Sequence, residues 1–269
     1  MSSLTAFAGS VPANYDKHLG PLLFETYALE LMDRLKKDDL RNVLEIACGT
    51  GRVTRHLLSM ISSDGRLLAT DLNPDMIEEA KRHVASEKIQ WQQADAQQLP
   101  FEQNSFDQVI CQFGVMFFPD KEAAFKEVFR VLEPGGKYIF SVWDNMIYNP
   151  RVFILNQVMD ELFKDDATDF LKKGPYSYFD KDEIRDKLLK AGFEDILIDV
   201  VMKTTELKNV DDVVLGFVDG SPLSSFLAKK PVAMQEAVRH KLREKINAQN
   251  EQYGSTMPLQ ALIIEAIKK

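Results

Sequence analysis

Several residue types that mark particular protein classes are scarce in this 269-residue chain. Cysteine occurs only as Cys48 and Cys111, which are far apart and form no Cys-x-x-Cys pair, so neither a disulfide framework nor a zinc cluster is expected. No apolar run approaches the ~20 residues that a membrane-spanning helix needs. Residues 1–11 lack the basic stretch and apolar core of a secretory signal. We therefore expect a cytoplasmic protein with reduced thiols and no membrane span.

Positive charge is also in short supply. Lys and Arg number 33 against 41 Asp and Glu, for a formal net charge of -8, and the lysine-rich stretches are short and interrupted by acids. Binding to nucleic acid phosphates needs Lys and Arg gathered on one face, so we expect no nucleic acid partner. The hydrophobic share of 45% and the charged share of 28% are those of an ordinary globular protein. A chain of this length can form one large α/β domain with an insertion and a sizeable core.

From about residue 42 onward, short apolar runs alternate with amphipathic stretches. This alternation is typical of βαβ units, which stack into a parallel sheet. We expect strands at 43–47, 66–72, 89–94, 106–113, 137–143, 196–202 and 259–267. The pattern therefore predicts an α/β fold with a seven-stranded, mostly parallel sheet flanked by helices, in which the last strand returns to the sheet as an edge strand.

The first expected strand ends in a glycine turn, Gly49-Thr50-Gly51, before a stretch with helical periodicity. Two glycines at this point let a ligand approach the backbone, and the N-terminus of the following helix favours negative charge. A dinucleotide-binding turn would carry a third glycine where this chain has Thr54. Glu45, four residues before Gly49, adds a carboxylate that suits a cationic amine better than a pyrophosphate. The turn alone leaves a dinucleotide and an amine-bearing nucleotide as alternatives.

The residues around this turn, Val43-Leu44-Glu45-Ile46-Ala47-Cys48-Gly49-Thr50-Gly51, resemble motif I of class I methyltransferases that depend on S-adenosylmethionine (SAM). The resemblance continues through 69–76, 93–101 and 131–136, and it covers roughly residues 41 to 143. It is a resemblance to the ubiquinone/menaquinone-type and type 11 families of small-molecule methyltransferases. It implies a Rossmann-like fold, SAM as cofactor and S-adenosylhomocysteine (SAH) as product.

The resemblance also implies roles for residues at the ends of three consecutive strands, where open parallel sheets bind their ligands. Glu45 faces the SAM ammonium, while the glycines admit the amino-acid end of the cofactor. Asp71 has two acceptor oxygens for the two ribose hydroxyls. Asp95 accepts from the adenine amino group, with the backbone amide of Ala96 beside it and Met76 on the adenine face. The expected cofactor-binding residues are Glu45, Ala47, Cys48, Gly49, Thr50, Gly51, Asp71, Leu72, Met76, Asp95, Ala96, Gln112 and Phe113.

SAM carries an activated methyl group, so the protein mainly has to orient an acceptor and exclude water. A general base is needed only when the acceptor must lose a proton. The segment Asn14-Tyr15-Asp16-Lys17-His18-Leu19-Gly20-Pro21 resembles the lid that folds over SAM in related enzymes. We hypothesise that Tyr15 and His18 border the methyl-transfer cavity as candidate catalytic residues. No metal is expected, because the strand that ends in Gln112-Phe113 lacks an acid to join Asp144-Asn145.

The motifs divide the chain into three regions. A helical N-terminal lid covers 1–40, the SAM-binding core covers 41–144, and 145–269 completes the sheet and adds a helical cap at about 145–175 and 208–257. Eight aromatic residues at irregular spacing in or near the cap suit either core packing or a substrate wall. An apolar cap beside a SAM pocket predicts a small, hydrophobic or aromatic acceptor, with O, C or N as the acceptor atom.

Two other functions stay open at this point. A nicotinamide-dependent oxidoreductase or epimerase would share the glycine turn, although the chain lacks a Tyr-x-x-x-Lys pair. A SAM-binding protein without catalysis would keep the same motifs. The run Gln112-Phe113-Gly114-Val115-Met116-Phe117 departs from the Asn/Asp-Pro-Pro-aromatic turn of methyltransferases that act on DNA bases, in agreement with the expected lack of a nucleic acid partner. The oligomeric state is left open, with a homodimer as one option.

Overall fold

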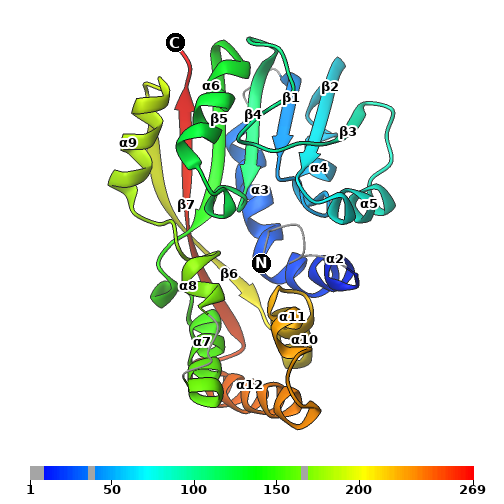
Figure 1. The fold of residues 1–269 in the computed structure, drawn as a ribbon, viewed down its shortest axis with the longest axis vertical. Coiled ribbons are helices and arrows are strands. Elements are labelled where there is room, and N and C mark those ends of the chain that lie inside the picture. The colour runs from blue at the N-terminus through cyan, green and yellow to red at the C-terminus, as the bar shows by residue number, and fades with distance from the viewer. Residues whose placement is uncertain (1–8, 36–39, 165–168) are drawn as a thin grey trace.

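The computed structural model describes residues 9–35, 40–164 and 169–269 (Figure 1). The seven strands are Leu40–Ile46 (β1), Ile61–Asp71 (β2), Ile89–Gln93 (β3), Phe106–Gln112 (β4), Leu132–Trp143 (β5), Leu197–Glu206 (β6) and Thr256–Ile267 (β7). They form one sheet in the order β3-β2-β1-β4-β5-β7-β6. The first five strands, β1 to β5, pair with one another in parallel. β7 pairs antiparallel with both β5 and β6. The expected α/β fold with a seven-stranded, mostly parallel sheet is confirmed, and each expected strand overlaps an observed one.

The expectation that the last strand lies at an edge is wrong. β7 lies between β5 and β6, and β6 forms that edge of the sheet. Leu262, Ile263 and Ile264 of β7 are fully buried, so consecutive side chains face packed layers on both sides, as in a central strand. The side chains of β6 are exposed or half-buried along its whole length, as on an edge strand. The pairing partners of a strand depend on contacts that the local apolar pattern does not contain.

Helices flank the sheet, and those that follow β1 lie where the amphipathic stretches predicted them. They are α3 (Glu25–Leu35), α4 (Arg52–Leu57), α5 (Pro74–His83), α6 (Lys121–Val131) and α9 (Lys181–Ala191). α3 packs on α4, α6 packs on α9, and α5 packs on β2 and β3. Capping residues explain where α5 and α6 begin. The Asn73 side chain accepts from the Asp75 N–H at the start of α5, where Pro74 is the first helical residue. The Asp120 side chain accepts from the Ala123 N–H at the start of α6.

The late helices lie beyond the carboxyl ends of the parallel strands, in the lower half of Figure 1. They are α7 (Pro150–Phe163), α8 (Phe170–Lys173), α10 (Val210–Asp219), α11 (Leu223–Leu227) and α12 (Val232–Tyr253). The N-terminal helix α2 (Val11–Asn14) and the π-helix η1 (Tyr15–Phe24) pack against α10, and η1 also contacts α3. Short 3-10 helices, η2 (Val115–Phe117) and η3 (Met146–Tyr148), follow β4 and β5. Segments from both halves of the chain therefore face the same strand ends.

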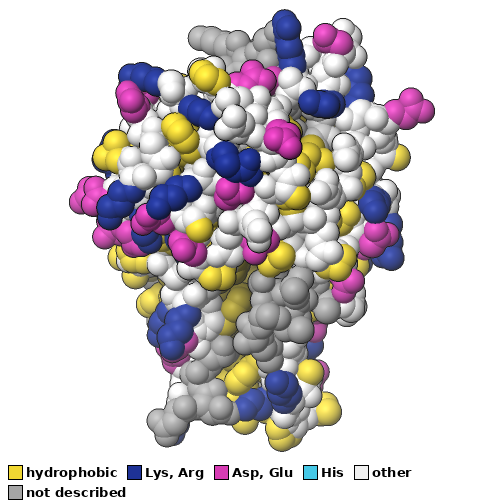
Figure 2. Space-filling model, turned by 45° about the horizontal axis from the view of Figure 1, so that its top comes forward, with side chains coloured by type: hydrophobic (Ala, Val, Ile, Leu, Met, Phe, Trp, Pro, Cys, Tyr) yellow, Lys and Arg dark blue, Asp and Glu magenta, His cyan; other side chains and the backbone are white. Residues whose placement is uncertain are grey.

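The surface carries mixed charge on the face shown in Figure 2, where Lys and Arg side chains are interspersed with Asp and Glu. Among the described residues, no helix is both long and apolar enough to cross a membrane. Residues 1–8, within the segment expected to lack a secretory signal, and residues 36–39, at the end of the expected lid, lie outside the described residues.

Candidate active site

The glycine turn is held against the end of β2 and the side of α5. The Gly49 N–H donates to Asp71 Oδ2 at 2.9 Å. Gly49 and Gly51 have φ values of 56° and 78°, in the left-handed region that favours glycine. A Cβ at Gly51 would lie 3.1 Å from the Ala80 Cβ, so a larger residue would crowd α5. The predicted succession of strand, glycine turn and helix is present.

Glu45 lies beneath this turn. The residue is 2% exposed, and the Thr54 hydroxyl donates to its Oε2 at 2.6 Å. Thr54 stands where a dinucleotide-binding turn would carry its third glycine, and here it joins α4 to β1 through this hydrogen bond. Burial raises the pKa of Glu45 to about 8. The carboxyl group therefore gains or loses its proton close to neutral pH.

A large cavity, called the strand-end cavity below, opens at the carboxyl ends of β1, β2 and β4. It brings together most of the expected cofactor-binding residues. Those on its wall are Ala47, Gly49, Asp71, Leu72, Met76, Asp95, Ala96, Gln112 and Phe113. Those outside its wall are Glu45, Cys48, Thr50 and Gly51. As expected for the carboxyl ends of parallel strands, Asp71, Asp95 and the first glycine of the turn lie around the strand-end cavity.

Two carboxylates stand on the wall of the strand-end cavity. Asp71 Oδ1 accepts from the Asn73 N–H at 2.8 Å while Oδ2 accepts from Gly49, and burial raises the pKa of this carboxyl. Asp95 Oδ1 accepts from the Gln97 N–H at 2.9 Å and so shapes the turn after β3. A carboxylate oxygen has more than one lone-pair site, so each acid can shape its turn and still accept from a ligand.

The neighbouring ends of β1 and β4 carry a strained backbone. Ala47 and Phe113 have φ values of 54° and 53°, which residues other than glycine rarely adopt. Such outliers persist only where the surrounding structure holds them, and they cluster at ligand sites. Gln112 donates from Nε2 to the Phe24 carbonyl at 2.7 Å, and its buried Oε1 has no hydrogen-bond partner among the described residues. Gln112 thus lines the cavity and carries a buried acceptor oxygen that no described residue satisfies.

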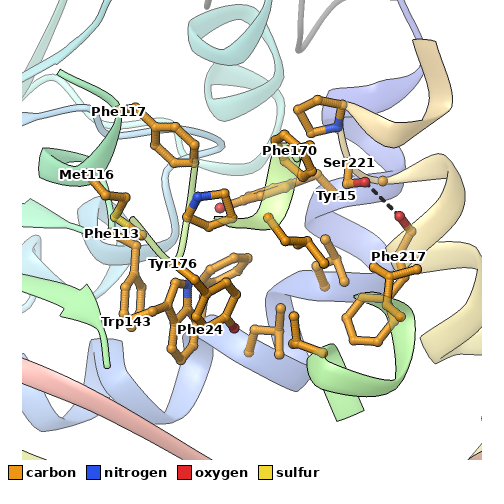
Figure 3. Close-up of a pocket in the computed structure, with 18 residues that line it drawn as sticks. Tyr15, Phe24, Phe113, Met116, Phe117, Trp143, Phe170, Tyr176, Phe217 and Ser221 are labelled. Atoms are coloured by element: carbon orange, nitrogen blue, oxygen red, sulfur yellow. Dashed lines mark hydrogen bonds between the residues drawn. The ribbon is translucent and has the colours of Figure 1, made fainter. Parts of the chain in front are cut away.

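A second cavity, called the aromatic cavity, lies between the strand ends and the late helices (Figure 3). Phe113 stacks on Trp143 with 4.0 Å between ring centroids, and Trp143 stacks on Tyr176 at 6.0 Å. Among the described residues that line it, none carries a carboxylate, an imidazole, an amine or a guanidinium. Its aromatic lining residues are Tyr15, Phe24, Phe113, Phe117, Trp143, Phe170, Tyr176 and Phe217.

The two cavities have part of their walls in common. The residues that line both are Tyr15, Phe113, Met116, Phe117, Phe170 and Pro222. Tyr15 stacks on Phe24 with 4.9 Å between ring centroids, and burial raises the pKa of its hydroxyl. This hydroxyl stays protonated near neutral pH, so it can donate a hydrogen bond but does not act as a base.

His18, paired with Tyr15 in the sequence-based hypothesis, lies on the wall of neither cavity. The residue is 7% exposed, and its Nδ1 lies 3.0 Å from Asp212 Oδ1 on α10. The structure therefore brings Tyr15 to both cavities and joins His18 to a late helix.

Sequence reasoning missed two parts of the aromatic cavity. Trp143 ends β5, and its place at the carboxyl end of a strand could have identified it as a candidate. Ser221 and Pro222 precede α11 and carry no motif, and the fold alone brings them to the wall. The Ser221 hydroxyl donates to the carbonyl of Phe217, four residues earlier in the chain, along the dashed line in Figure 3.

Within residues 9–35, 40–164 and 169–269, no three His, Cys, Asp or Glu side chains group in a way that could hold a metal ion. Asp144, weighed as a metal ligand from the sequence, accepts instead from the Asn145 N–H and from Gln260 Nε2, both at 2.7 Å. These contacts fix the chain after β5.

Comparisons with known proteins point to one family. A family model described as a methyltransferase domain matches residues 43–136. The chain is 28% identical over 202 residues to a demethylmenaquinone methyltransferase of Staphylococcus epidermidis, with 70% of this chain and 84% of that protein covered. It is 29% identical over 209 residues to the ubiquinone/menaquinone biosynthesis C-methyltransferase UbiE of Francisella tularensis subsp. novicida, with 70% of this chain and 81% of that protein covered. These findings support a SAM-dependent methyltransferase of class I.

The fold of this methyltransferase agrees with a solved structure. The phosphoethanolamine N-methyltransferase 2 of Haemonchus contortus matches with a TM-score of 0.60 and 19% identity over 96% of this chain and 56% of that chain, a likeness of fold alone. The sequence-based predictions of the family, of SAM as cofactor and of an enzyme that transfers methyl groups are confirmed. These findings do not favour a nicotinamide-dependent oxidoreductase.

Proposed function

We propose that this methyltransferase transfers the methyl group of SAM to a small, uncharged, hydrophobic or aromatic acceptor held in the aromatic cavity. The observation that carries the proposal is the wall shared by two unlike cavities. The strand-end cavity offers carboxylates and backbone groups, whereas the aromatic cavity offers rings and aliphatic side chains. A charged acceptor would lose its hydration there without gaining a charged partner from the described lining residues. SAM and the acceptor would meet beside Tyr15 and Phe113.

The strand-end cavity has a partner for each part of SAM. We assign the ribose hydroxyls to Asp71, because both of its oxygens keep lone pairs beside their backbone bonds. We assign the adenine amino group to Asp95, with Ala96 and Met76 around the ring, since all three lie on the same wall. The amino-acid end then lies over Gly49, where the absence of a side chain permits close approach.

The cofactor ammonium has two candidate acceptors. Gln112 lies on the cavity wall, and its buried Oε1 is without a partner in the part of the chain that the structure describes. Glu45 lies deeper, beneath the glycine turn, where its ionised form would attract a cation. A bound cation nearby would lower the Glu45 pKa from its raised value of about 8. We therefore assign the direct contact to Gln112 and the supporting charge to Glu45.

The residues of the enzyme act mainly by orientation. When bound, SAM would supply a methyl group from its sulfonium. An electron pair of the acceptor would bond to the methyl carbon as the sulfur–methyl bond breaks, SAH would leave, and any proton that the acceptor loses would pass to solvent after the transfer. The aromatic cavity holds the acceptor in line with that bond and keeps water out. None of its described lining residues serves as a base near neutral pH, because the pKa of Tyr15 is raised by burial. This favours an acceptor whose attacking atom needs no base from the protein.

The names of the two relatives support the same class of acceptor. One protein is named for demethylmenaquinone, and the other is named as a C-methyltransferase of ubiquinone and menaquinone biosynthesis. By analogy we propose an acceptor that carries a ring, and we place carbon ahead of O and N as the acceptor atom. The stacked rings of Phe113 and Trp143 suit a planar ligand.

We also propose the regional roles that the sequence suggested. The N-terminal segment acts as a lid, and α7, α8 and α10 form the acceptor cap, because residues of these elements line the aromatic cavity. The mixed charge on the face in Figure 2 supports the expectation that the protein has no nucleic acid partner. We also propose that the protein is located in the cytoplasm. The oligomeric state, with a homodimer as one option, can be measured by light scattering.

Calorimetry with SAM, SAH and NAD tests the cofactor, and transfer of a tritiated methyl group tests the acceptor. We expect SAM and SAH to bind and NAD not to bind. Methyl transfer should favour uncharged ring compounds over analogues of the same ring that carry a carboxylate or an amine. Tight binding of NAD without binding of SAM, or a preference for the charged analogues, would contradict the proposal.

A further inference from the structure

Asp16 is a buried carboxylate for which the methyl-transfer step has no direct use. The residue is 8% exposed and lies on η1. Its Oδ1 accepts from the Thr50 hydroxyl at 2.8 Å, from Arg52 Nη2 at 2.9 Å and from Arg55 Nη2 at 3.3 Å. A carboxylate buried this deeply is costly unless it is paired. The three donors to Oδ1 come from the glycine turn and the start of α4, and His83 Nε2 on α5 lies 3.7 Å from Oδ2.

Arg52 also completes the backbone of η1. In a π-helix the N–H of residue i donates to the carbonyl of residue i−5, so the Asp16 carbonyl would pair with residue 21. Pro21 has no N–H, and Arg52 Nη2 donates to the Asp16 carbonyl at 2.9 Å instead. Gly20 makes room for the guanidinium, because a Cβ at this position would lie 2.1 Å from Nη2. The sequence of η1 is therefore fitted to Arg52.

The other end of η1 is held as well. Arg52 Nη1 donates to Glu25 Oε2 at 2.7 Å, and Glu25 Oε1 lies 2.8 Å from His56 Nε2. Gln112 Nε2 donates to the Phe24 carbonyl at 2.7 Å. These contacts attach both ends of η1 to α4 and to the end of β4.

We propose that Asp16 is a positioning residue for methyl transfer, which holds η1 against the glycine turn and so keeps Tyr15 on the wall that the two cavities share. This inference rests on the proposed function, since it takes SAM to bind at the turn. Thr50 lies between the two glycines, so its bond to Asp16 reaches the part of the turn assigned to the amino-acid end of SAM. Detachment of η1 would break these buried contacts and move Tyr15 away from both ligands.

Loss of the attachment lowers the fraction of protein that is competent to bind, and the apparent affinity for a ligand falls with that fraction. We expect Asp16→Asn and Thr50→Val each to weaken SAH binding about tenfold, the effect of losing one buried hydrogen bond to a charged group. Thr50→Ser keeps the hydroxyl and should bind SAH like the wild type. The double variant should lose less than the product of the two single losses, because both changes act on one contact.

Trypsin cleavage after Lys17 reports on the attachment directly, because Lys17 is exposed but its peptide bond lies within η1. Mass spectrometry follows this cut in the full chain with and without SAH, and calorimetry gives the SAH affinity. We expect faster cleavage in Asp16→Asn and Thr50→Val, wild-type cleavage in Thr50→Ser, and protection of the wild type by SAH. Glu78→Gln, the matched control, removes one negative charge from an exposed site on α5 and should change neither measurement.

Wild-type cleavage and wild-type SAH affinity in both Asp16→Asn and Thr50→Val would overturn the inference. If Asp16→Asn fails to fold, Thr50→Val and its comparison with Thr50→Ser decide the matter alone. A wild-type protein that does not bind SAH would contradict the proposed function, whereas the cleavage rates without SAH would still show whether Asp16 holds η1.

Discussion

Replacement of Asp71 by Asn removes the charge assigned to the SAM ribose while it keeps the size of the side chain. Both carboxylate oxygens accept backbone N–H groups, from Gly49 at 2.9 Å and from Asn73 at 2.8 Å. An Asn side chain has one oxygen, so one of these N–H groups would face an amide NH2, at a cost of about 1–3 kcal/mol to the folded state. A ribose hydroxyl bonded to a charged acceptor gains about 1.5–3 kcal/mol, part of which a neutral amide retains. We therefore expect SAH binding to weaken by about 1–3 kcal/mol, or about 5- to 150-fold.

Calorimetric titration with SAH measures this loss, and thermal denaturation of the same samples separates folding from binding. Asp75→Asn is the matched control, because Asp75 lies in the first turn of α5 with an exposed side chain. The control should keep wild-type SAH affinity. A folded Asp71→Asn protein whose Kd stays within about threefold of the wild-type value would refute the assignment of the ribose to Asp71.

Three further predictions concern the buried acid, the aromatic cavity and the end of the chain. Glu45 keeps its proton up to about pH 8 in the folded state but releases it near pH 4.5 when unfolded. The free energy of unfolding should thus fall by about 1.4 kcal/mol per unit as pH rises between these values, and urea titrations should show that Glu45→Gln removes this slope. Trp143→Phe keeps an aromatic ring against Phe113 but removes part of the wall of the aromatic cavity. The KM for the acceptor should therefore rise severalfold, while the calorimetric Kd for SAH stays unchanged. Lys268 Nζ donates to an amide oxygen at 2.8 Å and to two carbonyls near the end of α6 at 2.7 Å, so Lys268→Met should lower Tm by about 5–10 °C.

Each of these three predictions has a contrary result. Parallel pH profiles of wild type and Glu45→Gln would show that the carboxyl is not protonated in the fold. A weaker SAH Kd with an unchanged acceptor KM in Trp143→Phe would move this residue to the cofactor side. Lys269→Met is the control for Lys268→Met, since its side chain is half-exposed, and an equal fall in Tm for both would argue against the buried contacts.

The fold was predictable from the sequence to the extent that its signals are local. The apolar run of β1 and the Asn73 and Asp120 helix starts lie within a few residues of the structure they form. The place of β7 between β5 and β6 is set by pairing between distant segments, so the apolar run at 259–267 identified a strand but not its neighbours.

The cofactor side of the site was more predictable than the acceptor side for the same reason. Asp71 ends β2 and Asp95 lies two residues after β3, and the carboxyl ends of parallel strands meet at one edge of a sheet. Trp143, Tyr176 and Phe217 come from β5, from the loop after α8 and from α10, so no spacing in the sequence connects them. The side-chain directions in η1 could not be predicted from the sequence either. This π-helix depends on Gly20 and Pro21 together with Arg52, which is distant in the sequence.

The strained ends of β1 and β4 explain how the two sides of the site meet. The chain leaves β1 toward β2 and leaves β4 toward β5, so the two ends diverge and a crevice opens between them. Ala47 and Phe113 turn the backbone at this point with positive φ values, at a cost of about 1–3 kcal/mol each. The turn at Phe113 places its ring on Trp143 and leaves it on the walls of both cavities. The strained backbone therefore positions a side chain that lines both cavities.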